Sequence, residues 1–273
     1  IGVVHWIASE TWLNMLARDS SRSRVMGVYA TVMAGGFASG PVLLTLPGTA
    51  GWIPFAAIAA ASLFALVPLL LIGSAPPALD RPMHLDLFGA MRTVPLVIAA
   101  ALAAGFVDTA LFTLIPVYGV RAGQTTELAV LTLGVFTAGN LFLQYPLGWI
   151  ADHTDRRWTA VATATIVALG AIAFPLMLPQ PGPAFWSMLF VWGGVSWGLY
   201  GIGLALLGDR FRPEQLAAAN AAFVMTYQAG AITGPVLAGV ALDHWPVYGL
   251  TTAVSLVAGL FILLAVAAAL LGR

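Results

Sequence analysis

Eight apolar stretches, each about 20 residues long or longer, dominate this chain and restrict what it can fold into. Inside a bilayer only helices and closed barrels satisfy all their backbone hydrogen bonds, and barrel strands alternate over only about 10 residues. The sequence therefore predicts an all-α integral membrane protein. Its spans are expected near residues 25–46, 53–73, 94–118, 127–150, 158–178, 185–207, 215–241 and 249–271, with residues 1–16 as the end of a ninth.

Composition excludes most other classes of protein. The chain is 60% hydrophobic and only 8% charged, whereas soluble domains carry about 25% charged residues. Such sparse charge cannot cover a soluble protein of this size. Because Cys is absent and the formal net charge is zero, a disulfide scaffold and a nucleic-acid partner are excluded. The apolar start without a basic stretch predicts no cleavable signal peptide.

The arginines predict the orientation. Ten of the 11 basic residues, all arginines, fall on one side of the expected spans, and only Arg121 falls on the other. The positive-inside rule makes the arginine-rich loops and the C-terminus cytoplasmic. The absence of Lys and Cys beside abundant Ala is typical of a GC-rich bacterial genome, so we expect the bacterial inner membrane. The Pro-rich, charged segment 74–93 is the predicted cytoplasmic linker between bundles.

Two parts of the chain repeat at an offset of 194 residues. Internal repeats of this kind are typical of secondary transporters built from two related helical bundles; the alternative is the small-residue spacing common to packed membrane helices. The offset places the start of the first bundle about 100 residues before Ile1, so we expect a piece of a longer protein. The matching positions are Arg18 with Arg212, Gly36 with Gly230, and Gly40-Pro41 with Gly234-Pro235.

Three motifs resemble those of the major facilitator superfamily. The series Gly27, Gly36, Gly40-Pro41 is similar to its fifth-helix signature, although Leu44-Thr45 replace the usual closing Gly-Gly. Gly148-x-x-x-Asp152-x-x-x-Arg156-Arg157 is similar to its loop between helices 8 and 9. The runs 9–14 and 22–29 resemble the bacterial YcaD-like permeases.

The resemblance implies two six-helix bundles, of which the N-terminal one is truncated. Residues 1–73 would hold helices 4–6, residues 74–93 the linker, and residues 94–273 helices 7–12. It also implies a secondary active transporter that moves a small solute by alternating access. Asp152 and Asp155 leave a helix at the cytoplasmic side, within reach of helix N-termini and of Arg22 or Arg24. We therefore hypothesise that Asp152 latches one conformation; the alternative is a simple loop cap.

Ionisable groups at membrane depth are the leading candidates for function. Asp108 is predicted near mid-membrane and Glu10 about 12 Å from the cytoplasmic end. Removal from water favours a neutral carboxyl group, which suits proton coupling or a cationic substrate; the alternative is an interhelical hydrogen bond. Helical spacing adds expected cavity residues, for which ordinary packing is the alternative: Trp6, Asn14, Asn140, Gln144, Trp192, Ser196, Tyr200 and Gln228 beside Tyr227.

The sequence therefore predicts a monomeric, proton-driven transporter of a small solute, with no cofactor and no metal. Efflux of an amphiphilic or cationic compound is favoured over uptake of a polar nutrient, and a transport-dead receptor or scaffold is the alternative from another class. An enzyme is not expected. Gly194-x-Ser196-x-Gly198 lies within a span instead of a strand–turn–helix, and without Cys the four scattered His residues form no metal-ligand cluster.

Overall fold

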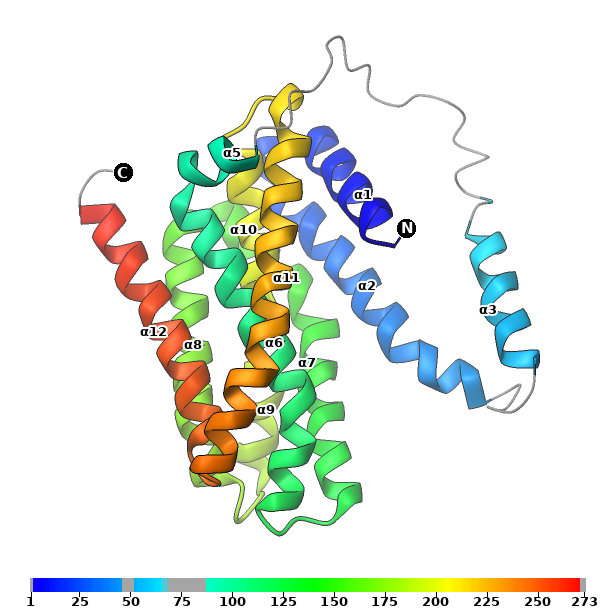
Figure 1. Ribbon diagram of the computed structural model, residues 1–273, viewed down its shortest axis with the longest axis vertical. Coiled ribbons are helices and arrows are strands. Elements are labelled where there is room, and N and C mark those ends of the chain that lie inside the picture. Colours follow the sequence, from blue (N-terminus) through cyan, green and yellow to red (C-terminus); the bar gives the residue numbers. More distant parts are fainter. Residues whose placement is uncertain (1, 46–51, 66, 68–86, 271–273) are drawn as a thin grey trace.

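The computed structural model describes residues 2–45, 52–65, 67 and 87–270. Within these residues all regular secondary structure is helical (Figure 1). The elements are α1 (Gly2–Leu16), the short 3-10 helix η1 (Asp19–Ser21), α2 (Arg22–Thr45), α3 (Ile53–Phe64), α5 (Leu87–Thr93), α6 (Pro95–Arg121), α7 (Thr126–His153), α8 (Arg156–Met177), α9 (Pro183–Ser196), α10 (Gly198–Gly208), α11 (Pro213–His244) and α12 (Gly249–Leu270).

Six helical segments among the described residues are long and apolar enough to cross a membrane. They are α6, α7, α8, the pair α9–α10, α11 and α12, and they coincide with the six spans expected between residues 94 and 271. The prediction of an all-α membrane protein is therefore confirmed. Helices α2 and α3 coincide with the spans expected at 25–46 and 53–73, of which the second is described only in part.

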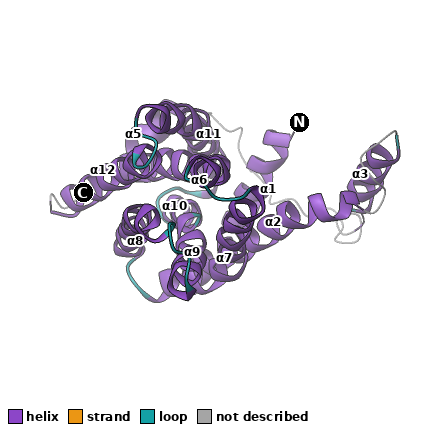
Figure 2. Cartoon of the chain, turned by 90° about the horizontal axis from the view of Figure 1, so that it is seen from below, coloured by secondary structure: helices purple, strands orange, loops and turns teal. Residues whose placement is uncertain are grey.

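Helices α6 to α12 pack into one bundle around an apolar interior (Figure 2). Its most extensive contact joins α6 to α11, where glycines bring the two backbones together. A Cβ on Gly230 or Gly234 would collide with the backbone of α6, and one on Gly105 with the backbone of α11. The second copy of the predicted repeat therefore serves helix packing, as small residues commonly do in membranes.

Helices α1 and α2 lie against one side of this bundle. Helix α2 packs on α7 and α10, and α1 packs on α11 and α10. The contact with α7 is tight near the start of α2, but a Cβ on Gly36 would meet no atom within 4 Å, and α2 diverges from α7 beyond it (Figure 1). The two copies of the repeat therefore differ in their surroundings. The side chains at Gly40 and Pro41 lie outside the described residues.

The expected division into bundle, linker and bundle remains a prediction. Most of segment 74–93 lies outside the described residues, and its last part forms the short helix α5, which packs on α11. Both views place α3 beyond the end of α2 and away from the bundle of α6 to α12 (Figures 1 and 2). Its large apolar side chains are exposed, with Phe55 at 73% and Phe64 at 76%.

Candidate functional site

A central cavity of about 140 Å³ lies between α1 and α2 on one side and α6, α10 and α11 on the other. Polar side chains from both sides face it, and Met and Trp side chains form much of its remaining wall. The polar lining consists of Glu10, Tyr29, Asp108, Tyr200 and Tyr227, and the rest of Met26, Ala30, Met33, Trp197, Gly201 and Leu204.

Two carboxyl groups in this cavity are joined through two tyrosines. The Tyr200 hydroxyl donates to Glu10 Oε1 at 2.5 Å. The Tyr227 hydroxyl donates to Asp108 Oδ2 across a longer 3.4 Å. The rings of Tyr200 and Tyr227 meet edge to face, with centroids 4.8 Å apart. A string of polar groups therefore runs from α1 through α10 and α11 to α6.

Both carboxyl groups are removed from solvent, with Glu10 0% and Asp108 2% exposed. A buried acid is costly unless it is protonated or compensated by hydrogen bonds or a counter-charge. Asp108 Oδ1 has no hydrogen-bond partner among the described residues. Since Glu10 belongs to α1 and Asp108 to α6, movement of α1 relative to the bundle would alter the surroundings of both acids.

Other polar residues of α1 attach this helix to the bundle. The Asn14 amide donates to the carbonyl of Leu204 at 2.8 Å, and the Asn220 amide donates to Thr11 Oγ1 at 3.1 Å. Asn14 was expected in the cavity, but it forms an interhelical contact instead and does not line the hollow. The side chain of Trp6 lies outside the described residues.

Trp192 and Ser196 do not line this cavity with Tyr200, and their part in a binding site stays a prediction. Trp192 is 1% exposed and packs on Phe136 and Phe174 inside the bundle, where its indole N–H donates to the Val167 carbonyl at 3.0 Å. Ser196 bonds to the Trp192 carbonyl within its own helix. The helical spacing fails here because α9 ends at Ser196 and α10 begins at Gly198.

Three further candidates also lie away from the cavity. The Gln144 amide of α7 donates to the Gly194 carbonyl of α9 at 2.9 Å. Asn140, one turn earlier, is buried between helices, and Gln228 is partly buried on α11. None of them contributes to the cavity lining. Spacing identified shared faces correctly, but each face turns toward a neighbouring helix that the sequence does not specify.

Tyr227, which the sequence paired with Gln228, lines the cavity, and so does Tyr29, which was not a candidate. A signal for Tyr227 was present, because it precedes Gly230 by three residues and so shares the α11 face that packs on α6. That face meets the α6 segment around Gly105, three residues before Asp108. No comparable signal marks Tyr29.

A second site lies at the arginine-rich end of the helices, where Asp152 of α7 meets the start of α2. Its carboxylate accepts the backbone N–H groups of Ser23 and Arg24, both at 2.9 Å, and the Arg24 guanidinium at 3.1 Å. The Asp152 side chain is 0% exposed. This geometry caps a helix N-terminus, where a negative charge is stabilised by unpaired N–H groups and the helix dipole.

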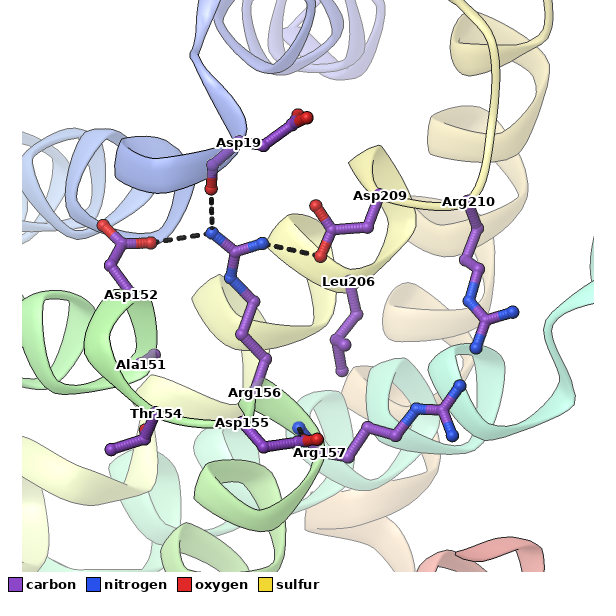
Figure 3. Close-up of a pocket in the computed structure, with 10 residues that line it drawn as sticks. All are labelled: Asp19, Ala151, Asp152, Thr154, Asp155, Arg156, Arg157, Leu206, Asp209 and Arg210. Carbon is purple, nitrogen blue, oxygen red and sulfur yellow. Dashed lines mark hydrogen bonds and ion pairs between the residues drawn. The ribbon is translucent and has the colours of Figure 1, made fainter. Parts of the chain in front are cut away.

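Arg156 connects this cap to α10 (Figure 3). Its guanidinium donates to Asp152 at 2.8 Å, to Ser23 Oγ at 2.7 Å and to Asp209 at 2.6 Å. Asp209 also accepts from Arg22 at 2.6 Å, so it links two arginines. The motif had indicated Asp152 and Arg156, whereas Asp209 was missed because it lies alone after the end of α10.

The remaining motif residues have local roles. The Asp155 carboxylate caps α8 by accepting from the backbone N–H of Arg157 at 2.8 Å and of Trp158 at 3.4 Å. The Arg157 side chain points away from the network and toward Arg210 (Figure 3). Asp155 thus caps its own helix, whereas Asp152 connects α7 to α2, and the latch proposed for Asp152 stays a prediction.

Two motif glycines allow α2 and α7 to approach. A Cβ on Gly27 would lie 2.7 Å from the Gln144 carbonyl oxygen, and one on Gly148 would collide with the Ser23 carbonyl. We expect Gly27→Ala to lower the free energy of unfolding by about 1–3 kcal/mol, as overpacking typically does. Gly36→Ala is the matched control, because its Cβ meets open space. Thermal unfolding of the full-length protein in detergent measures both; equal midpoints would contradict the prediction.

The fold and the two sites define a multi-pass helical membrane protein with buried acids at a helix interface. The family model described as Major Facilitator Superfamily matches residues 1–204, and the chain belongs to this family. The resemblance seen in the sequence motifs is therefore confirmed.

Curated relatives support the same assignment. The chain is 27% identical over 244 residues to the uncharacterized MFS-type transporter YfkF of Bacillus subtilis (strain 168), covering 85% of this chain and 60% of the relative. It is 25% identical over 252 residues to the uncharacterized MFS-type transporter YcaD of Salmonella paratyphi B, covering 88% and 62%. The chain thus spans about three fifths of the length of these relatives.

Solved structures show the same fold. The chain is similar to the E. coli fucose:proton symporter FucP, with a TM-score of 0.75 and 15% identity over 95% of this chain and 72% of that one. It is also similar to a bacterial homologue of the iron transporter ferroportin in an outward-facing state. That TM-score is 0.70 at 11% identity, covering 91% and 65%.

Proposed function

We propose that the full-length protein is a secondary active transporter that moves a small solute by alternating access and couples this movement to protons. The observation that carries the proposal is the string Glu10–Tyr200–Tyr227–Asp108, which connects two buried acids across the α1–bundle interface. Membership of the Major Facilitator Superfamily supports transport. Buried acids within membrane helices mark ion and proton pathways in many transporters.

In this proposal the two acids exchange protons for substrate. When ionised, Glu10 and Asp108 place negative charge in a small cavity with aromatic walls, which suits a cationic or amphiphilic solute. Protonation removes this charge and weakens binding of the cation. Because Tyr200 joins Glu10 to α10, a change in the charge of Glu10 would also alter the contact between α1 and the bundle. Export is thus favoured, with protons entering as the solute leaves.

The Asp152 cap supplies the second part of the cycle. It joins α7 to the start of α2 and so closes the arginine-rich end of the interface, while α2 diverges from α7 toward the other end (Figure 1). We place the arginine-rich end on the cytoplasmic side of a bacterial inner membrane, by the positive-inside rule. Breaking and reforming the cap would open and close the cytoplasmic entrance to the cavity.

Proton-coupled uptake of a polar solute is the second candidate. It is favoured by the fold similarity to a fucose:proton symporter and by the hydroxyl groups of Tyr200 and Tyr227 in the cavity wall. Direction distinguishes the two candidates: an exporter lowers the cellular content of its substrate, whereas a symporter raises it.

Binding of a fluorescent lipophilic cation to the purified full-length protein tests the proposed site. We expect its affinity to fall as the pH is lowered, because protonated carboxyl groups no longer attract the cation. Proton–ligand coupling is typically about 5- to 150-fold in affinity, and Glu10→Gln should reduce this dependence. Glu127→Gln, at an exposed position on α7, is the matched control. If neither the pH nor Glu10→Gln changed the affinity for the cation, Glu10 would be excluded from the site.

A further inference from the structure

A groove separate from the central cavity lies where α6 begins and where α10 and α12 end. Its volume is about 620 Å³. Three arginines from different elements line it: Arg92 at the end of α5, Arg157 in the first turn of α8, and Arg210 just after α10. Segments distant in sequence therefore bring three positive charges to one hollow.

The groove has no acidic residue among its described lining residues. Arg92 and Arg210 form no ion pair with another described residue, and the Arg157 and Arg210 guanidinium groups point toward one another (Figure 3). Helix α6 also begins here at Pro95 without a side-chain cap, and its N-terminal end adds partial positive charge. Since Arg92 and Arg210 bring like charges to the groove without a described ion-pair partner, this arrangement favours an anion beside them.

The rest of the wall is apolar. Leu96 and Ala99 of α6 face Leu264, Ala267 and Ala268 near the end of α12. Both helices are membrane-spanning segments, and Leu264 remains 47% exposed. A free phosphate would fill only the arginine end, whereas a phospholipid presents an anionic phosphate and an apolar chain together.

We propose that this groove binds an anionic phospholipid, with its phosphate between Arg92, Arg157 and Arg210 and an acyl chain along α6 and α12. The lipid belongs to the leaflet on the arginine-rich side. Basic pockets between membrane helices are suited to such headgroups, because each nearby arginine adds attraction to the anionic surface. This inference concerns a site distinct from the transport cavity and does not depend on the proposed transport.

The test is lipid binding to the full-length protein in detergent, with bound phosphatidylglycerol counted by native mass spectrometry. The variant is Arg92→Gln with Arg210→Gln. The matched control, Arg18→Gln with Arg212→Gln, removes two arginines from exposed positions on the same side of the spans and outside the groove. We expect the groove variant to bind phosphatidylglycerol about tenfold more weakly and the control to bind it unchanged.

Two further measurements identify the ligand of the groove. Phosphatidylcholine with the same acyl chains should bind weakly to every variant, and inorganic phosphate at millimolar concentration should not displace phosphatidylglycerol. The proposal is overturned if the groove variant and the control bind phosphatidylglycerol equally. It is also overturned if phosphatidylcholine binds as tightly as phosphatidylglycerol, or if inorganic phosphate alone displaces phosphatidylglycerol. Equal thermal unfolding of the two double variants ensures that a loss of binding reflects the groove.

Discussion

Asp152→Asn is expected to open the arginine-rich end of the α2–α7 interface. The substitution removes the negative charge that accepts two backbone N–H groups of α2 and two guanidinium groups. Hydrogen bonds to a charged group contribute about 1.5–3 kcal/mol, which corresponds to a shift of about 10- to 150-fold between closed and open states. We expect this shift to favour the open state.

A cysteine in the cavity measures this opening. The chain contains no Cys, and a Cβ on Gly201, which lines the cavity, would meet no atom within 4 Å. A membrane-impermeant maleimide added on the arginine-rich side should label Gly201→Cys faster in the Asp152→Asn background. Asp155→Asn is the matched control, because Asp155 only caps α8 and Asn caps helices equally well. If Gly201→Cys were labelled at the same rate alone, with Asp152→Asn and with Asp155→Asn, Asp152 would only cap α2 and would not hold the interface closed.

Asp108→Asn is expected to abolish coupling to the proton gradient while preserving the shape of the cavity. Asp108 is 2% exposed, and Tyr227 is its one described hydrogen-bond partner. The amide therefore fits the same space, but it can neither carry a negative charge nor take up and release a proton. In proteoliposomes an imposed pH gradient should stimulate movement of a lipophilic cation by the parent protein. The variant should show no stimulation but should still exchange cation for cation.

Tyr227→Phe separates coupling from packing. It removes the Tyr227 hydroxyl, and with it the 3.4 Å hydrogen bond to Asp108, but leaves the carboxyl group and the ring contact with Tyr200. We therefore expect partial stimulation, between that of the parent and that of Asp108→Asn. Full stimulation in Asp108→Asn would show that another group carries the proton.

The helices and the two buried acids could be predicted from the sequence because each depends on a local property. A run of about 20 apolar residues must be helical in a bilayer, and an acid within such a run has few roles available. The contact between Asp152 and Arg24 was also predictable. The carboxylate follows a helix end in a recognisable motif, and the basic residues sit on the same predicted side.

The exact lining of the cavity could not be predicted, because helical spacing shows which residues share a face but not which neighbour that face meets. Trp192 and Gln144 lie on faces that pack against α8 and α9. The break at Trp197 also interrupts the regular spacing before Tyr200. Asp209 lies outside any motif, and only the three-dimensional structure brings it to Arg22 and Arg156.

The most direct test of proton-driven export is the accumulation of a fluorescent lipophilic cation in cells that produce the full-length protein. We expect wild-type cells to accumulate less of the cation than cells without the protein. A protonophore should abolish this difference, and cells with Asp108→Asn should resemble cells without the protein. Equal accumulation in wild-type and protein-free cells would contradict export of lipophilic cations, and higher accumulation in wild-type cells would indicate uptake instead.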